Sequence, residues 1–177
     1  MMQINAETYK EYVKRLLDLD YTKLGEGGFG TVFQHPCFDN VAVKVVKQDR
    51  AYRKFASFCI ENPHNPWLPR IASVKSIKLD DANLAYVVFM EKLQPVTPAY
   101  VAQLKQAMQS KYGLRLWSDT QWFNRASWRA IAMHKDTPPD FAELAAYFAT
   151  NLNNVDLVPS NFMRRGNQLV FNDPMAG

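Results

Sequence analysis

The sequence predicts an α+β fold, with an antiparallel sheet in the first half of the chain and helices in the second. Short runs of β-branched and aromatic residues alternate with turn-forming residues between positions 21 and 90. Apolar residues then recur at helical spacing between positions 97 and 152. The hydrophobic content of 47% and the charged content of 21% are those of a globular domain with a core of its own.

A helix opens the first half and strands follow it. We expect the helix to be capped by Asn5 and to end near Leu19, with one apolar face. Asp49 is expected to cap a second helix that ends before Pro63. The expected strands are 21–24, 31–34, 41–46, 71–77 and 84–90. Because turns or one helix join them, an antiparallel five-stranded sheet is predicted.

Three helices and a hairpin are expected in the second half. Thr97 is a suitable cap for the first helix, and Pro98 suits a first helical position. The expected helices run from Pro98 to Gly113, from Ser118 to about His134, and from Pro139 to about Asn153. The expected hairpin joins 162–165 to 169–171 through Gly166 and Asn167.

Charge and cysteine content narrow the classes of partner. The net charge is +4, and the charges are scattered rather than gathered in a block, so we expect no nucleic-acid partner. The two cysteines, Cys37 and Cys59, have no metal or redox spacing and are expected to be free thiols in a reducing compartment. No apolar run reaches 18 residues, so we expect no membrane contact and a cytoplasmic location.

A glycine-rich segment is the first motif that indicates chemistry. Four of the seven glycines fall between Gly25 and Gly30, and glycine lets backbone N–H groups approach phosphates closely. A dinucleotide fold would need a helix after the loop, and a Walker loop would need Gly-Lys. Strand, glycine loop and strand is instead typical of protein kinases. The candidate nucleotide-binding residues here are Gly25, Glu26, Gly27, Gly28, Phe29, Gly30 and Val32.

This arrangement requires a lysine on the next strand. Lys44 stands there between valines, where it would hold the α and β phosphates of ATP. A lysine in such a strand is otherwise a common edge-strand device. Further along, Met90–Leu93 has the pattern of a kinase hinge, so Glu91 is a candidate for the adenine side of the site.

Two loops near the C-terminus carry the remaining polar residues. Asp156 and Asn161 have the spacing that in kinases places an acid–base group at the substrate hydroxyl and an amide on a metal ion. Asp173 follows a strand-like run and would be the second magnesium ligand. Each alone is an ordinary turn residue. Their order after the glycine loop and Lys44 favours phosphoryl transfer.

With these motifs, the chain resembles the kinase-like proteins of tailed bacteriophages, and is similar to the early host-shutoff Ser/Thr protein kinases of autographivirus-type phages. The resembling stretches are Leu24–Leu93 and Asp156–Pro174, and the Asn-Asp-Pro at 172–174 stands in place of Asp-Phe-Gly. The resemblance implies magnesium-dependent transfer from ATP to hydroxyls of host proteins in the host cytoplasm. It also implies a reduced protein-kinase-like bilobal fold with ATP between an N-lobe at 1–93 and a minimal helical C-lobe at 94–177.

Departures from the general kinase pattern leave alternatives open. Asn154 and Val155 replace the usual His and Arg, and the helix after Asp49 has no Glu before Glu61 to pair with Lys44. Asp49 or Glu61 could take the place of the missing Glu and pair with Lys44. The main alternative is therefore a weak or inactive pseudokinase that binds and inhibits a host protein. Phosphoryl transfer to a small molecule is a third reading.

The expected regulation and specificity follow from the remaining segments. Only Pro174–Gly177 follow Asp173, so we expect no phosphorylation-dependent activation. Substrate choice is then expected to come from 94–155, because aromatic and arginine residues anchor protein interfaces. The residues concerned are Trp117, Trp122, Trp128, Arg115, Arg125 and Arg129. For the three tryptophans, which do not share one helical face, a place in the core is the alternative to a partner surface.

Overall fold

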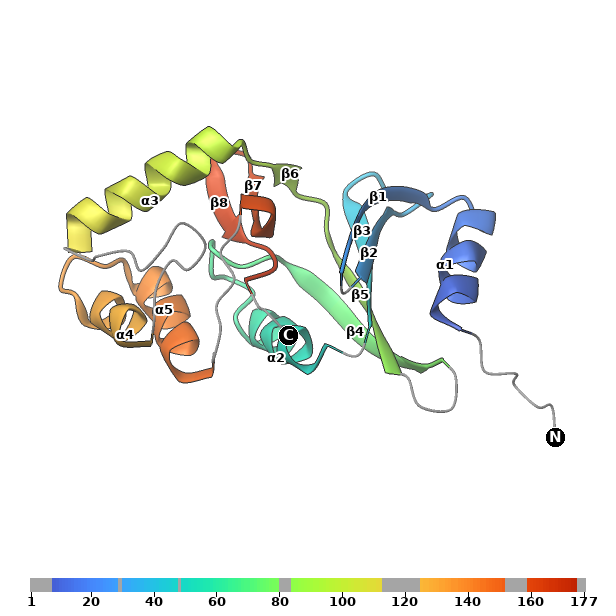
Figure 1. Ribbon diagram of the computed structural model, residues 1–177, viewed down its shortest axis with the longest axis horizontal. Coiled ribbons are helices and arrows are strands. Elements are labelled where there is room, and N and C mark those ends of the chain that lie inside the picture. The colour runs from blue at the N-terminus through green and yellow to red at the C-terminus, as the bar shows by residue number, and fades with distance from the viewer. Residues whose placement is uncertain are drawn as a thin grey trace. The chain divides into compact units, whose positions relative to one another are not determined.

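In the computed structural model, the described residues are 8–28, 30–47, 49–79, 84–112, 125–151 and 159–174. The chain divides into two compact units (Figure 1). The N-terminal unit comprises 1–63 and 70–92, and the C-terminal unit comprises 64–69 and 93–177. Both helices and an antiparallel sheet are present, which confirms the predicted α+β class.

The sheet of the N-terminal unit has five antiparallel strands in the order β1-β2-β3-β5-β4. All five strands predicted from the sequence are present. Their bounds are Thr22–Gly27 for β1, Gly30–Gln34 for β2, Val41–Lys47 for β3, Ile71–Lys78 for β4 and Leu84–Glu91 for β5. The strand β3 lies in the middle and is buried along almost its whole length, whereas the edge strand β1 is exposed throughout.

Helix α1, Tyr9–Asp18, packs on one face of this sheet. Its cap is Thr8, whose side chain accepts from the Glu11 N–H while the Glu11 carboxylate accepts from the Thr8 N–H. The predicted cap, Asn5, lies outside the described residues. A small apolar cluster joins the helix to the sheet: Leu16, Phe33, Val45, Leu79 and Ala85.

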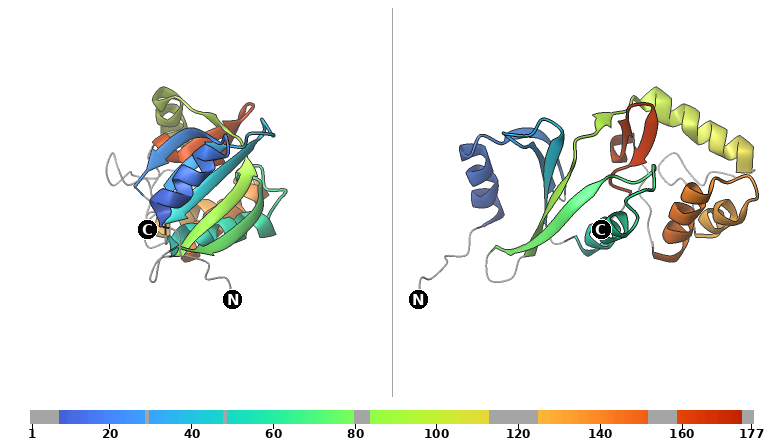
Figure 2. Two further views of the ribbon diagram at one scale, coloured as in Figure 1. Left: turned by 90° about the vertical axis from the view of Figure 1, so that its right-hand side faces the viewer. Right: turned by 180° about the vertical axis from the view of Figure 1, so that it is seen from behind.

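Helix α2, Arg50–Glu61, lies on the opposite face of the sheet (Figures 1 and 2). Asp49 caps it as predicted, because its carboxylate accepts from the Tyr52 N–H at 2.9 Å. The buried side of the helix consists of Tyr52, Phe55, Ala56 and Cys59. The sheet is therefore covered by a helix on each face.

The C-terminal unit contains three described helices and a small sheet. The helices are α3, Pro98–Tyr112; α4, Arg125–Met133; and α5, Pro139–Asn151. The prediction of a helix over 118–134 is thus confirmed only from Arg125, because 113–124 lie outside the described residues. The predicted hairpin is present as β7, Phe162–Arg165, and β8, Gln168–Phe171. A two-residue strand, β6 at Gln94–Pro95, pairs with β7, and the 3₁₀ helix η1 spans Pro159–Asn161.

An aromatic cluster forms the core of this unit. The Trp128 ring lies 4.8 Å from the Phe148 ring and 6.5 Å from the rings of Phe141 and Phe171, measured between centroids. Trp128 is 0% exposed. The hypothesis that it anchors a protein partner is therefore wrong, since its helical spacing places it inward. The tryptophans at 117 and 122 and Arg115 lie outside the described residues.

The segment 64–69 belongs to the C-terminal unit although it lies between α2 and β4 in sequence. Several contacts attach it there, among them the hydrogen bond that the Asn65 amide donates to the Asp140 carbonyl at 2.7 Å. The Arg165 guanidinium donates to the carbonyls of Pro66 and Leu68, at 3.3 and 2.9 Å, and the Phe171 N–H donates to the Trp67 carbonyl at 2.8 Å. The chain thus changes unit at 63–64, at 69–70 and at 92–93.

Both cysteines are free thiols, as predicted. Cys37 is exposed and Cys59 is buried. Burial raises the pKa of the Cys59 thiol well above its usual value. Among the described residues, no helix has the length and apolar content needed to cross a membrane.

Replacement of Gly30 by alanine is expected to destabilise the N-terminal unit. A Cβ atom at Gly30 would lie 2.4 Å from the Val45 carbonyl oxygen, which is backbone and cannot rotate away. We expect the Gly30→Ala variant to lose about 1–3 kcal/mol of unfolding free energy, measured by urea denaturation. The control is Gly28→Ala, since nothing lies within 4 Å of a Cβ at that position. Equal stability of the two variants would contradict the close approach of β2 and β3.

Candidate active site

The register of the N-terminal sheet brings the glycine loop and Lys44 to one face. Gly25 pairs with Val32, Val32 pairs with Lys44, and Lys44 pairs with Val88. Directly opposed residues on antiparallel strands project to the same side of a sheet. The three predicted site residues Gly25, Val32 and Lys44 therefore stand in a single row across three strands.

A second row runs parallel to the first. Gly27 pairs with Gly30, and Gly30 pairs with Val46. This row is displaced from the first by two residues along each strand, so it faces the same side. The face is the one that α2 covers at β4 and β5, because the Tyr52 hydroxyl lies 3.9 Å from the Met90 sulfur.

Glycine occurs at these positions for two different physical reasons. Gly30 is required by the fold, as the close approach of β3 shows. A Cβ at Gly25, Gly27 or Gly28 would meet nothing within 4 Å, and none of these three has a φ in the left-handed range. The protein itself therefore does not demand glycine at these three positions. A ligand group that approaches the loop would require glycine there, because the absence of a side chain lets backbone N–H groups reach the ligand.

Lys44 is a buried lysine whose ammonium lies against an aromatic ring. Its exposed fraction is 6%, and that of Tyr52 is 0%. The Lys44 Nζ lies 3.7 Å from the centroid of the Tyr52 ring, which is within the range of a cation–π interaction. Strand alternation places Lys44 toward α2 and the next residue, Val45, in the cluster below α1.

Glu26 lies on the other side of the sheet from Lys44. It pairs with Thr31, whose hydroxyl accepts from the Tyr9 hydroxyl of α1 at 2.9 Å. The Glu26 carboxylate accepts a hydrogen bond from the Lys23 ammonium, and this contact lowers the pKa of Glu26. Its side chain is thus paired away from the row of Gly25, Val32 and Lys44. Phe29 lies outside the described residues.

The predicted hinge uses two of its backbone donors within the N-terminal unit. The Glu91 N–H donates to the Arg70 carbonyl at 3.0 Å, and the Lys92 N–H donates to the Asn40 carbonyl at 2.8 Å. The Glu91 carboxylate also accepts from the Arg70 N–H at 2.8 Å. Glu91 therefore holds the start of β4 against the end of β5, and an adenine contact at this residue stays a prediction.

Asn161 and Asp173 lie together at the open end of the β7–β8 hairpin. The Asn161 carbonyl accepts from the Asn172 N–H at 2.9 Å and from the Asp173 N–H at 3.2 Å. Both side chains are half-buried. Amide and carboxylate oxygens are the ligands that magnesium prefers, so this pair fits the ion by its chemistry. Asp156 lies outside the described residues.

The part of the chain that the structure describes contains no group of three or more His, Cys, Asp or Glu side chains that could hold a metal ion. A magnesium ion at Asn161 and Asp173 would thus depend on few protein ligands. This is the usual situation for magnesium, which keeps several waters and binds substrate phosphates as well.

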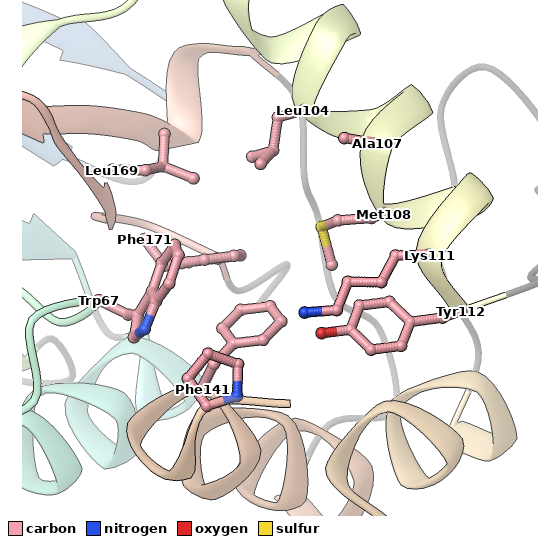
Figure 3. Close-up of a pocket in the computed structure, with 10 residues that line it drawn as sticks. Trp67, Leu104, Ala107, Met108, Lys111, Tyr112, Phe141, Leu169 and Phe171 are labelled. Carbon is pink, nitrogen blue, oxygen red and sulfur yellow. The ribbon is translucent and has the colours of Figure 1, made fainter. Parts of the chain in front are cut away.

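A hollow of about 190 Å³ lies within the C-terminal unit, next to α3 (Figure 3). Its walls are apolar and aromatic side chains, with the Lys111 ammonium and the Tyr112 hydroxyl extending toward Phe141. The lining residues are Trp67, Leu104, Ala107, Met108, Lys111, Tyr112, Pro138, Phe141, Leu169 and Phe171. The Lys111 ammonium already donates to the Asp136 carbonyl at 2.9 Å. Such walls suit an apolar group rather than a triphosphate, and no predicted site residue is among them.

Sequence reasoning missed Tyr52 as a residue of the site. Its spacing with Phe55 and Cys59 on the buried side of α2 fits an ordinary core residue. A signal was present nonetheless, because α2 has no acidic residue before Glu61 and the lysine of β3 needs a neighbour from that helix.

Comparisons with protein-family models and with curated proteins found no match to this chain.

Proposed function

We propose that this protein is an ATP-dependent kinase that transfers the γ-phosphoryl group to Ser or Thr hydroxyls of proteins. The observation that carries the proposal is the row of Gly25, Val32 and Lys44 on one face of the sheet. A glycine loop and a lysine on the same face are what a triphosphate needs, since backbone N–H groups and one ammonium would contact the same anion. We further propose that the two units form a reduced protein-kinase-like bilobal fold.

Each residue of the site has a role in this proposal. Gly25, Gly27 and Gly30 cover the phosphates, and Lys44 holds the α and β phosphates. Asn161 and Asp173 hold magnesium, which neutralises charge on the phosphates when it is bound. Asp156 orients the attacking hydroxyl and accepts its proton. Such catalysis rests on positioning and electrostatics, and requires no covalent step on the protein.

The proposed substrate is a host protein in the cytoplasm of a bacterial cell. This part of the proposal comes from the resemblance to phage kinases. The pseudokinase alternative is favoured by one observation, namely that α2 presents an aromatic ring rather than a carboxylate to Lys44. Both readings include nucleotide binding, so binding and turnover have to be tested separately.

Mg·ATP is expected to raise the melting temperature of the protein, because a ligand that binds only the folded state stabilises it. At a ligand concentration of about one hundred times Kd the gain is about 2.7 kcal/mol. Lys44→Met should abolish most of the shift. The matched control is Lys47→Met. Lys47 is on the same strand, but its Nζ lies 4.5 Å from the centroid of the Tyr9 ring of α1, on the opposite face of the sheet. Absence of any shift in the wild type at millimolar Mg·ATP would refute nucleotide binding.

Asp156→Asn is expected to reduce phosphoryl transfer by about a hundred- to ten-thousandfold, because general base catalysis contributes on that order. Binding of Mg·ATP should survive in this variant. Asp173→Asn should instead weaken the dependence of ATP binding on magnesium. The measurement is transfer of labelled phosphate from ATP to proteins of a bacterial lysate. Undiminished transfer by Asp156→Asn would exclude the assigned role, and no transfer by the wild type, with ATP binding intact, would favour the pseudokinase.

A further inference from the structure

The Lys44 ammonium and the Tyr52 ring form a contact that is shielded from water. Lys44 is 6% exposed and Tyr52 is 0% exposed, and the Nζ–centroid distance is 3.7 Å. An ammonium over the face of an aromatic ring is attracted by the negative charge of that face, and the attraction grows when water is excluded. The cation–π attraction between Lys44 and Tyr52 is therefore stronger than that of a solvent-exposed pair.

The Tyr52 ring is itself fixed by its surroundings. The backbone N–H of Tyr52 donates to the Asp49 carboxylate at 2.9 Å, which holds the first turn of α2. Its hydroxyl lies 3.9 Å from the Met90 sulfur on β5, and its ring lies 6.3 Å from the Phe55 ring. A fully buried ring that packs against Phe55 cannot follow a moving side chain. The ammonium that rests on it is confined in turn.

We propose that Tyr52 is a positioning residue for Lys44, and that it fixes the ammonium for contact with the phosphates of ATP. The inference rests on the proposed kinase function. In protein kinases a helix carboxylate holds the corresponding lysine. A tyrosine ring has no net charge, so it holds the ammonium without neutralising it.

If a cation–π contact with Tyr52 holds Lys44, then binding of Mg·ATP depends on the electron density of the ring and not on its shape. A test that varies only this property uses phenylalanine and fluorinated phenylalanines at position 52. Each fluorine withdraws electron density from the ring face while the ring stays nearly the same size. Dissociation constants of Mg·ATP and of adenosine are measured by calorimetry for each variant, with thermal unfolding as the check on folding.

We expect Tyr52→Phe to bind Mg·ATP within about twofold of the wild type, because the ring is kept. The dissociation constant for Mg·ATP should then rise stepwise with fluorination, reaching about tenfold for a trifluorinated ring. Adenosine binding should stay constant, since adenosine has no phosphates for Lys44 to contact. The same fluorinated residues at position 33 are the matched control. Phe33 is also 0% exposed but lies in the cluster below α1.

The possible outcomes distinguish failure of the proposed role of Tyr52 from failure of the proposed kinase function. A dissociation constant for Mg·ATP that does not change along the series would overturn the role of Tyr52 while leaving the nucleotide site intact. Parallel loss of ATP and adenosine binding would also overturn it, because a merely structural role gives that result. No binding of Mg·ATP by the wild type would refute the proposed function, and the role of Tyr52 with it.

Discussion

The burial of the Lys44 ammonium is the constraint on which the N-terminal unit depends. β3 is the middle strand of five, so a lysine there loses water on both sides of the strand. A buried charge is tolerated only where attractive contacts replace its hydration. The Tyr52 ring provides one such contact, and the placement of that ring requires the cap at Asp49 and the packing of α2 against the sheet. The helix and the lysine are thus parts of one arrangement.

The pairing register of β3 decides which residues serve the site and which serve the core. Lys44 faces α2, while Val45 belongs to the cluster below α1. A slip of one residue would exchange the two faces, placing an ammonium among Leu16 and Phe33 and a valine beside Tyr52. The hydrophobic cost of such a slip is what keeps Gly25, Val32 and Lys44 in one row. Core packing on one face therefore fixes the geometry of the candidate site on the other.

Most of the elements were predictable from the sequence, because alternation and helical spacing extend over whole strands and helices. The strands of the N-terminal sheet and the cap at Asp49 are examples. The two-residue strand β6 was not predictable, since it is too short to have a period. The attachment of 64–69 to the C-terminal unit was missed for a different reason. It depends on residues distant in sequence, such as Arg165 and Asp140, and no local pattern reveals their partners.

The site was predictable as a set of residue types but not as a set of contacts. The motifs gave the glycines, Lys44, Asn161 and Asp173, whereas Tyr52 looks like any core residue of an amphipathic helix. Its contact with Lys44 becomes visible only from the distance between its ring and the Lys44 Nζ. The side chain of Glu26 shows the converse, because a motif position does not reveal that the residue faces α1 and pairs with Lys23.

Backbone hydrogen bonds, rather than long side chains, position the candidate residues within each of the two units. Strand pairing fixes the glycines and Lys44, and a single carbonyl, that of Asn161, accepts from the N–H groups of both Asn172 and Asp173. Main-chain hydrogen bonds of this kind hold the Cα positions from which the functional side chains extend. Phosphoryl transfer gains most of its rate from positioning and from fixed charges, and it needs little chemistry from the protein. Backbone hydrogen bonds that fix a few side chains would therefore meet the main physical demand of the proposed reaction.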